Sequence, residues 1–236
     1  RPSFRERAPF TFYEYTEGTN IQGNPSLHRG TVDNFDFRWE YFMRPGEMVS
    51  LSLFYKLIQD PIERYYRQDN TNLTKFRNGK DSYLYGAEFE IRKNLEFIGL
   101  RNLEFGGNFS YIYSETPVDP ERLEQAREID SLFPAVRPLY GQAPYIINTF
   151  LHYNNEAHGI FANISFNVEG PKIVIINKRF TPDVYEQAFP ALNLNIGKTL
   201  YNKFTLELAV NNILNSKFKQ NLTMSDGKTY AFREYS

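Results

Sequence analysis

Residues 31–43 alternate between two kinds of side chain, and this alternation limits what the chain can fold into more than any other feature. Every odd position from Phe35 to Met43 is large and apolar. The even positions as far as residue 40 carry Asn34, Asp36, Arg38 and Glu40. Successive side chains of a β-strand point to opposite faces. The segment therefore predicts a strand with an apolar medium on one side and water on the other.

The same two-faced pattern recurs along the rest of the chain. Residues 145–153 are the least regular case, because Ile146 and Phe150 fall on the polar face. The total is about eight strands, each close to the roughly 9–11 residues that a tilted strand needs to cross a bilayer. The other alternating segments are residues 49–57, 83–92, 103–113, 160–168, 192–200 and 204–211.

The connections between these segments alternate in length. Long connections without secondary structure are uncommon inside compact soluble domains. Short turns at one rim and long loops at the other are typical of an outer-membrane barrel, with periplasmic turns and extracellular loops. The predicted fold class is therefore all-β, an antiparallel transmembrane β-barrel. The short connections are residues 44–47, 94–102, 154–159 and 201–203, and the long ones are residues 59–80, 114–142, 169–187 and 215–229.

Composition removes several other classes of protein. The absence of cysteine excludes a disulfide framework and a thiolate metal site. No run approaches the ~18 apolar residues of a membrane helix, so a chain that spans a bilayer would do so with strands. A net charge of −1 without a basic stripe gives no reason to expect nucleic acid as a partner. The aromatic content of 17% suits the interfacial girdles of a membrane barrel.

The two ends of the chain suggest a piece of a longer protein. The first residues, Arg1, Pro2 and Ser3, do not form a signal peptide. Residues 229–236 begin a new extended segment but do not complete a spanning strand. A bacterial barrel has an even number of strands and no open edge. We therefore expect residues 1–236 to be one portion of a larger barrel, with its other strands supplied from outside this sequence.

Several motifs, in this order and spacing, resemble the barrel of TonB-dependent outer-membrane receptors, particularly the Bacteroidota type. The resemblance runs along essentially the whole chain. It implies the C-terminal portion of a barrel of about 22 strands, of which these residues form about eight to nine. The plug, the TonB-contacting box, the early strands and the last strand of such a receptor would then lie outside the chain. The motifs are residues 1–10, 23–27, 34–42, 54–56 with 60–63, and 210–215.

The resemblance also implies a function. Such receptors import scarce, bulky ligands such as siderophores, cobalamin, glycans or peptides across the bacterial outer membrane, and they are not enzymes. The implied partners are outer-membrane lipid and lipopolysaccharide, a TonB-type energy-coupling protein that contacts the absent N-terminal region, a surface lipoprotein, and the transported ligand. No cofactor is implied.

Two other classes of protein fit part of the pattern. A passive outer-membrane pore or an adhesin would share the alternation and the loop lengths, and would differ in lacking the receptor motifs and the plug. A soluble secreted β-sandwich that binds carbohydrate, or a hydrolase of that architecture, would have to pack its apolar faces on another sheet. The sandwich leaves the sorting of short and long connections unexplained.

The alternation assigns side chains to the two faces of the wall. The candidate ligand contacts are Arg38, Glu40, Glu88 and Arg92 in the lumen and Arg64, Tyr65, Tyr66 and Arg67 near the outer rim. The rim group mixes cations and aromatic rings, which suits an anionic ligand or a lipopolysaccharide phosphate. Lipid-facing residues are predicted to include Phe35, Trp39, Leu51, Leu53, Phe89, Phe105, Ile164, Leu194 and Leu206, and lumen-facing residues Asp36, Arg38, Glu40, Lys56, Glu88, Glu90, Arg92, Glu104 and Glu207.

Two local patterns invite an enzymatic or metal-binding interpretation. Glu88 and Glu90 lie two apart on one face, roughly 7 Å between Cα atoms, which is compatible with a glycosidase carboxylate pair. Lumen charge paired with Arg92 is the simpler interpretation, and it is the one we favour. The histidines, His28, His152 and His158, lack the spacing of metal ligands, so no metal site is predicted.

The long connection 114–142 carries helix signals. Asp119 suits an N-cap, Pro120 suits the first helical position, and acidic residues follow. These signals predict a short loop helix through about Leu132. We treat the helix as a self-packed excursion, with a lid over the ligand as the competing hypothesis, and the length of the connection suggests that it touches ligand.

Overall fold

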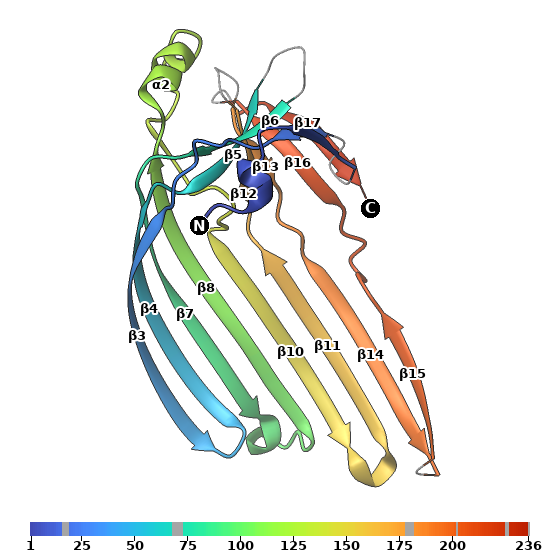
Figure 1. Cartoon of the computed structure of the whole chain (residues 1–236). Coiled ribbons are helices and arrows are strands. Elements are labelled where there is room, and N and C mark those ends of the chain that lie inside the picture. Colours follow the sequence, from blue (N-terminus) through green and yellow to red (C-terminus); the bar gives the residue numbers. More distant parts are fainter. Residues whose placement is uncertain (16–18, 68–72, 178–181, 202, 225–226, 236) are drawn as a thin grey trace.

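Eight long antiparallel strands form a curved wall, as the computed structural model shows (Figure 1). The structure describes residues 1–15, 19–67, 73–177, 182–201, 203–224 and 227–235, without the side chains of Arg67 and Tyr235. The prediction of about eight strands is confirmed. Their order in the sheet is β15-β14-β11-β10-β8-β7-β4-β3. They are β3 (Thr31–Arg44), β4 (Glu47–Gln59), β7 (Ser82–Asn94), β8 (Leu103–Pro117), β10 (Tyr145–Asn155), β11 (Ile160–Glu169), β14 (Ala191–Leu200) and β15 (Phe204–Val210).

The wall is part of a barrel and not a closed one. When the smaller strands outside the wall are left out, each wall strand pairs with the wall strands that precede and follow it in the sequence. Within the described residues no strand continues this sheet beyond β3 on one side or β15 on the other. The predicted fold class, a barrel fragment with open edges, is confirmed.

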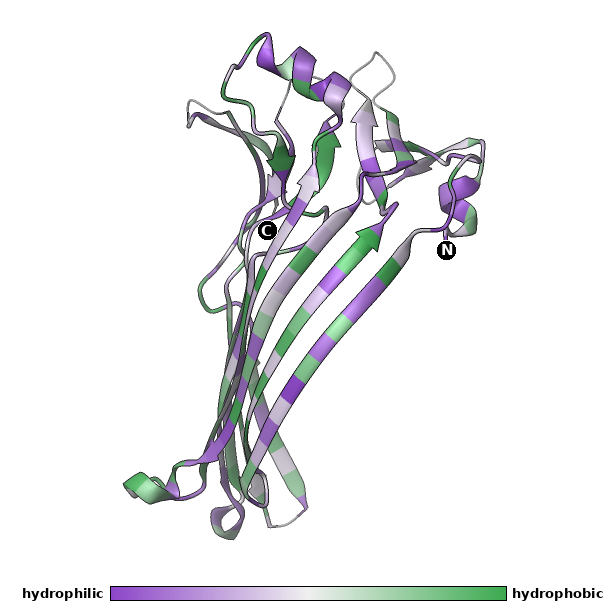
Figure 2. Ribbon diagram, turned by 90° about the vertical axis from the view of Figure 1, so that its left-hand side faces the viewer, coloured by the Kyte–Doolittle hydropathy of each residue, from purple (hydrophilic) through white to green (hydrophobic). Residues whose placement is uncertain are grey.

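Register fixes the two faces of the wall. Across three neighbouring strands, Phe37, Leu53 and Ala87 pair directly on one face. The next row, Arg38, Ser52 and Glu88, pairs on the other face. Carried across the sheet, this register puts every residue predicted to face lipid in the apolar set and every residue predicted to face the lumen in the polar set. Figure 2 shows the resulting alternation of apolar and polar residues along each strand.

Three of the phenylalanines that break the polar pattern of the lumen face lie over glycines of a neighbouring strand. The alternation in the sequence places Phe150 on the polar face, and there it pairs directly with Gly106. A Cβ atom on Gly106 would overlap the Phe150 ring, so the ring lies over the glycine. Phe161 covers Gly197 in the same way, and Phe54 covers Gly86. Each ring is thereby packed on the wall instead of standing in the lumen.

Three of the long connections (59–80, 169–187 and 215–229), the N-terminal segment before β3 and residues 229–235 form a second sheet at one end of the wall (Figure 1). Treating these connections as polar loops without structure was wrong, because their strands pair with one another across the connections. In sheet order the strands are β1 (Thr11–Glu14), β2 (Thr19–Gln22), β6 (Leu73–Asn78), β5 (Ile62–Arg67), β12 (Lys172–Asn177), β13 (Val184–Glu186), β16 (Phe218–Thr223) and β17 (Thr229–Tyr235).

Small apolar clusters support the second sheet. Ile21, Leu27 and Phe76 form one buried cluster, against which Phe12 and Ile62 pack. The segments that supply this cluster are far apart in the chain. Ile173, Ile176 and Val184 on β12 and β13 are also almost fully buried. Burial of this apolar surface from separate connections is what gives otherwise polar segments a fixed arrangement.

The helices are short. Helix α1 (Phe4–Arg7) begins with a capping box formed by Ser3 and Glu6, and α2 (Pro120–Arg127) begins at the predicted N-cap, Asp119. Single 3₁₀ turns, η1 (Leu95–Ile98) and η2 (Glu156–His158), occupy two of the short connections. Among the described residues, no helix has the length and apolar character needed to cross a membrane, and this finding does not bear on β-barrels.

The predicted helix through Leu132 ends earlier, at Arg127. The chain turns back because Phe133 packs with Val118 and Ala126 in a buried cluster. The Arg127 side chain donates a hydrogen bond from Nε to the carbonyl oxygen of Phe133, 3.2 Å away, and so holds the reversal. The short strand β9 (Val136–Arg137) then returns to pair with the end of β8.

Substitution of Leu53 by arginine tests the facing of the wall. Leu53 is 46% exposed on the apolar face, and an arginine at the bilayer midplane costs about 2–4 kcal/mol. We expect the free energy of unfolding in lipid vesicles to fall by this amount. Asn108→Arg, on the lumen face beside Glu90, is the matched control and should change it little. Equal effects of the two substitutions would contradict the assignment of faces.

Candidate ligand-binding site

A chain of ion pairs runs across the lumen face near β3, β4 and β7. Arg38 is its centre: its Nε lies 2.6 Å from Glu40 Oε1 and its Nη2 lies 3.3 Å from Glu90 Oε2. Arg38 Nη1 also donates to Ser52 Oγ at 3.2 Å. Arg92 continues the chain with Nη2 at 3.7 Å from Glu90 Oε1. We call these five residues the lumen network.

The structure brings together three of the four lumen candidates. Arg38, Glu40 and Arg92 meet through Glu90. Glu88 stands apart, where its Oε1 accepts a hydrogen bond from Ser110 Oγ at 3.4 Å. Glu88 and Glu90 therefore have different partners, which supports the interpretation of lumen charge over that of a carboxylate pair.

A small cavity of about 180 Å³ lies beside the lumen network. Glu90 and Arg92 line it from one side, and Asn148 and Phe150 from the other. Asn148 Nδ2 donates to Asn108 Oδ1 at 2.8 Å, so the amides on the cavity wall are held in place. This part of the lumen offers both charged and amide hydrogen-bonding groups.

The rim candidates form a separate group on β5. Arg64, Tyr65 and Tyr66 lie in the second sheet and are half-buried, where we had expected an exposed loop. The Tyr65 ring stacks under the guanidinium group of Arg77, 5.4 Å from the ring centroid. The backbone of Arg67 ends β5, and its side chain lies outside the described part of the structure. The ion pairs of the lumen network join residues of β3 and β7, and this group lies on β5 of the other sheet.

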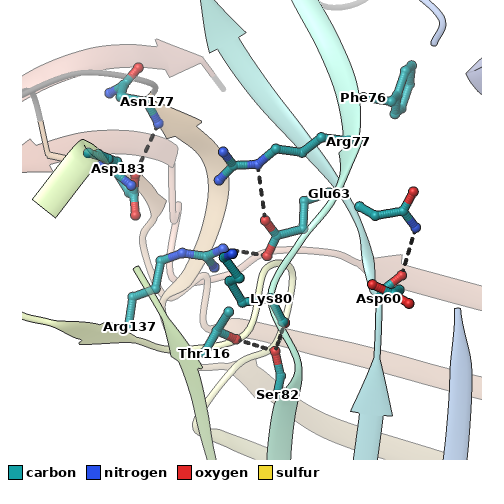
Figure 3. A network of polar contacts seen from close by, with 12 residues as sticks. Asp60, Glu63, Phe76, Arg77, Lys80, Ser82, Thr116, Arg137, Asn177 and Asp183 are labelled. Carbon is teal, nitrogen blue, oxygen red and sulfur yellow. Dashed lines mark hydrogen bonds and ion pairs between the residues drawn. The ribbon is translucent and has the colours of Figure 1, made fainter. Parts of the chain in front are cut away.

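A buried carboxylate, Glu63, organises this rim (Figure 3). Its side chain is 1% exposed and forms ion pairs with Arg137, itself 6% exposed, and with Arg77, whose Nε lies 3.6 Å from Glu63 Oε2. The carboxylate rests on Gly79, where a Cβ atom would come within 2.5 Å of it. Because Arg137 pairs in register with Thr116, which continues the lumen face of β8, this cluster belongs to the lumen side.

A cavity of about 660 Å³ opens beside Glu63. Cations and anions share its wall. The pair of His28 and Asp60, with Nε2 and Oδ2 3.2 Å apart, closes one side of it. Residues from five separate stretches of the chain thus meet around one space. Its charged lining residues are His28, Asp60, Glu63, Arg77, Lys80, Asp81, Asp119 and Arg137.

A second buried ion pair fixes α2 to the second sheet. Arg122 Nη2 lies 2.7 Å from Asp183 Oδ1, and the two side chains are 3% and 8% exposed. Asp183 Oδ1 also accepts a hydrogen bond from the backbone N–H of Asn177 at 3.0 Å. Burial and the nearby Asp183 carboxylate raise the pKa of Tyr185 to about 12. Tyr185 and Asp183 line a further cavity of about 250 Å³ together with Phe133 and Met224.

The histidines have ordinary partners. His28 pairs with Asp60, and His158 Nδ1 lies 3.1 Å from Asn155 Oδ1. His152 lies on the lumen face, in register with Glu104 and Asn163. Within the part of the chain that the structure describes, no group of three or more histidine or acidic side chains is placed to hold a metal ion.

Sequence reasoning missed Glu63, Arg77, Arg137 and the pair of Arg122 with Asp183 as a structural unit. These residues lie in connections that the alternation could not order. The only available signal was the number of charged residues in the long connections, which an exposed loop would explain equally well.

Comparison with known proteins agrees with this geometry. The model of the family described as "Outer membrane protein beta-barrel family" matches residues 1–236. The chain belongs to that family. No curated protein matches the chain. Membership confirms the predicted location in the bacterial outer membrane and the barrel character of the wall.

Solved structures of other outer-membrane β-barrel proteins share the fold. A variant of the ferric enterobactin receptor PfeA from Pseudomonas aeruginosa, in complex with enterobactin, has a TM-score of 0.60 at 14% identity over 92% of this chain and 32% of that one. The ferric yersiniabactin uptake receptor FyuA from Yersinia pestis gives 0.58 at 13% identity over 86% and 28%. The copper transporter OprC gives 0.55 at 17% identity over 80% and 26%.

These likenesses establish the fold. The chain spans about a third or less of each of those structures. The resemblance to receptor barrels that the sequence motifs suggested is confirmed at the level of fold. The position of the chain within the complete barrel, as its C-terminal portion, stays a prediction.

The substitution Glu63→Gln tests whether the buried cluster of Glu63, Arg77 and Arg137 stabilises the second sheet. The substitution keeps the shape of the side chain but leaves Arg137 buried without its counter-charge. Removing one partner of a buried ion pair lowers the free energy of unfolding by about 3–5 kcal/mol. We expect faster backbone amide hydrogen exchange in β5 and β6 of the complete protein. Glu169→Gln, which removes an ion pair to Lys172 with the carboxylate 45% exposed, should leave exchange nearly unchanged. Unaltered protection of β5 and β6 in Glu63→Gln would contradict the role of the cluster.

Tyr185 predicts a pH dependence of the second sheet. Its pKa is raised from 10.0 to about 12 in the folded chain, so folding favours the neutral phenol. The stabilisation is fully present below pH 10 and is lost as the pH rises toward 12. We expect amide protection in β12 and β13 to fall over this range. Tyr185→Phe should remove that part of the pH dependence, and an identical profile in both proteins would show that Tyr185 does not contribute.

Proposed function

We propose that this chain forms the wall and ligand-holding rim of an outer-membrane receptor that imports a bulky polar ligand. One observation carries the proposal: the long connections fold into an ordered sheet that holds a cavity of about 660 Å³ on the lumen side of the wall. Ligand pockets commonly measure about 300–1,000 Å³. The lumen network supplies further polar contacts below this rim.

The order of the rim supports a receptor over a passive pore or an adhesin. A receptor has to present the same groups to each ligand molecule, and pre-arranged groups lose less entropy on binding. Here two buried ion pairs, Glu63 with Arg137 and Arg122 with Asp183, hold segments from different connections together. A pore needs only an open lumen, and nothing in its function requires charges buried in its connections.

The soluble sandwich does not fit the wall. A sandwich would bury the apolar face of its sheet against a second sheet. In this chain the apolar face is exposed along its length, with Phe37 at 61%, Leu53 at 46% and Leu206 at 65%. The second sheet extends the end of the wall and leaves that face uncovered (Figures 1 and 2).

The ligand classes that the motifs imply are siderophores, cobalamin, glycans and peptides. Two of the structural neighbours are named as receptors for ferric siderophores and one as a copper transporter, which favours a metal chelate among these classes. The mixed charge around the rim cavity suits a ligand that carries both hydrogen-bond donors and acceptors. Energy coupling would require a TonB-type partner acting on a plug outside this chain.

Uptake in cells tests the proposal. The complete protein would be expressed in an outer membrane that lacks other siderophore receptors, and uptake of ferric siderophores labelled with radioactive iron would be measured with and without a protonophore. We expect saturable uptake that the protonophore abolishes. Uptake that is linear in concentration and insensitive to the protonophore would indicate a passive pore. Protonophore-sensitive uptake of cobalamin, glycans or peptides, without uptake of ferric siderophores, would support the receptor function but exclude a metal chelate as the ligand.

Substitution in the cavity sharpens the same test. Deleting the connection 114–142 would also remove Arg122 and leave Asp183 buried without its ion-pair partner. Substitutions of single side chains are therefore better probes. Lys80→Gln removes an exposed cavity cation, and we expect it to raise the KM for uptake. Lys217→Gln removes an exposed cation paired with Glu234, which is not among the cavity residues, and should leave KM unchanged. Equal KM values in both variants would contradict a ligand role for the cavity.

A further inference from the structure

The turn between β7 and β8 exposes apolar residues that the wall does not need. Phe97 is 69% exposed, Ile98 59% and Leu100 48%. The connection is long enough to join two neighbouring strands without them, since the equally placed turn after β3 uses only Pro45 and Gly46 between its strands. In water this apolar surface is unfavourable, so a partner for it is expected.

The turn lies on the lipid side of the wall. Lys93 pairs in register with Phe105, on the apolar face. Its Nζ lies 5.6 Å from the centroid of the Phe97 ring and 2.6 Å from Glu47 Oε2. The ring is therefore held beside a side chain of the lipid face. Figure 2 shows the turn as the mostly apolar coil that projects at the lower end, on the side opposite to α1.

The lipid face of the wall carries aromatic side chains at the same rim as η1. At the same rim β3 exposes Tyr41 at 56%, and its register with Val49 and Ile91 places it on the lipid face. A cationic side chain, Arg101, is exposed directly after Leu100. Aromatic and basic residues at one level are the usual composition of a membrane interface, where rings lie among headgroups and cations reach phosphates.

We propose that η1 and Leu100 form an anchor in the periplasmic leaflet of the outer membrane, with phospholipid as the occupant. Short connections of such barrels face the periplasm, and interfacial helices bury their apolar face about 5–10 Å into the boundary between headgroups and acyl chains. The anchor fixes the height and tilt of this side of the barrel. It does not depend on which ligand is transported.

The chain contains a matched control for this anchor. The turn η2 is also a single 3₁₀ turn at a short connection, and its exposed residues are Glu156, Ala157 and His158. It has the same place in the architecture without the apolar side chains. If position at the rim alone brought a turn into lipid, both turns would enter it. The proposal requires that only η1 does.

Nitroxide labels decide the question. Phe97→Cys, Ile98→Cys and Ala157→Cys would be made in the complete receptor, labelled, and reconstituted in vesicles of phosphatidylethanolamine and phosphatidylglycerol. Folding would be checked by the heat-dependent shift in gel mobility. Electron paramagnetic resonance would then compare access of oxygen, which concentrates in lipid, with access of a water-soluble nickel chelate.

We expect oxygen to be favoured at positions 97 and 98 and the nickel chelate at position 157. Nickel access at 97 and 98 equal to that at 157 would overturn the proposal, because the turn would then lie in water. Protection of 97 and 98 from both reagents would also overturn it, since the occupant would then be protein, either a second copy or a periplasmic partner. Because the measurement needs no ligand, it is independent of the proposed transport function.

Discussion

Hydrocarbon offers no hydrogen-bond partner to the peptide backbone, and this constraint organises the whole chain. Each N–H and C=O group of a spanning segment must be paired within the protein. The wall strands meet the requirement between neighbours by pairing in sequence order, with only the outer edges of β3 and β15 open within the described residues, and the side chains then fall alternately toward lipid and lumen. The apolar face, the polar lumen and the sorting of connections to two rims are all consequences of that one requirement.

Away from the bilayer a different interaction orders the chain. The connections at the far rim are too polar to build a large core, and they are held by small apolar clusters and by two buried ion pairs. Burying charge is costly unless it is paired, so Glu63 and Asp183 are useful only in the arrangement that presents their arginine partners. The same interaction that fixes the rim also shapes the cavities beside it.

How much the sequence predicts follows from the range of each interaction. The alternation is local, so the wall strands and the facing of residues such as Leu53 and Arg38 could be read directly. The second sheet depends on pairing between segments far apart, as where β5 meets β12, and no local pattern announces it. For the same reason the lumen facing of Arg38, Glu40 and Arg92 could be predicted, whereas the contact of Glu63 with Arg137 could not. The end of α2 was misplaced because the packing of Phe133 decides it.

Labelling of single cysteines along β4 in intact cells would test the two-faced wall most directly, since these 236 residues contain no cysteine of their own. Each position from 51 to 57 would be replaced in turn in the complete protein and exposed to a membrane-impermeant maleimide after gentle permeabilisation of the outer membrane. The account predicts labelling with a period of two, strong at even positions in the lumen and weak at odd positions in lipid. Uniform labelling, or labelling of the odd positions, would contradict it.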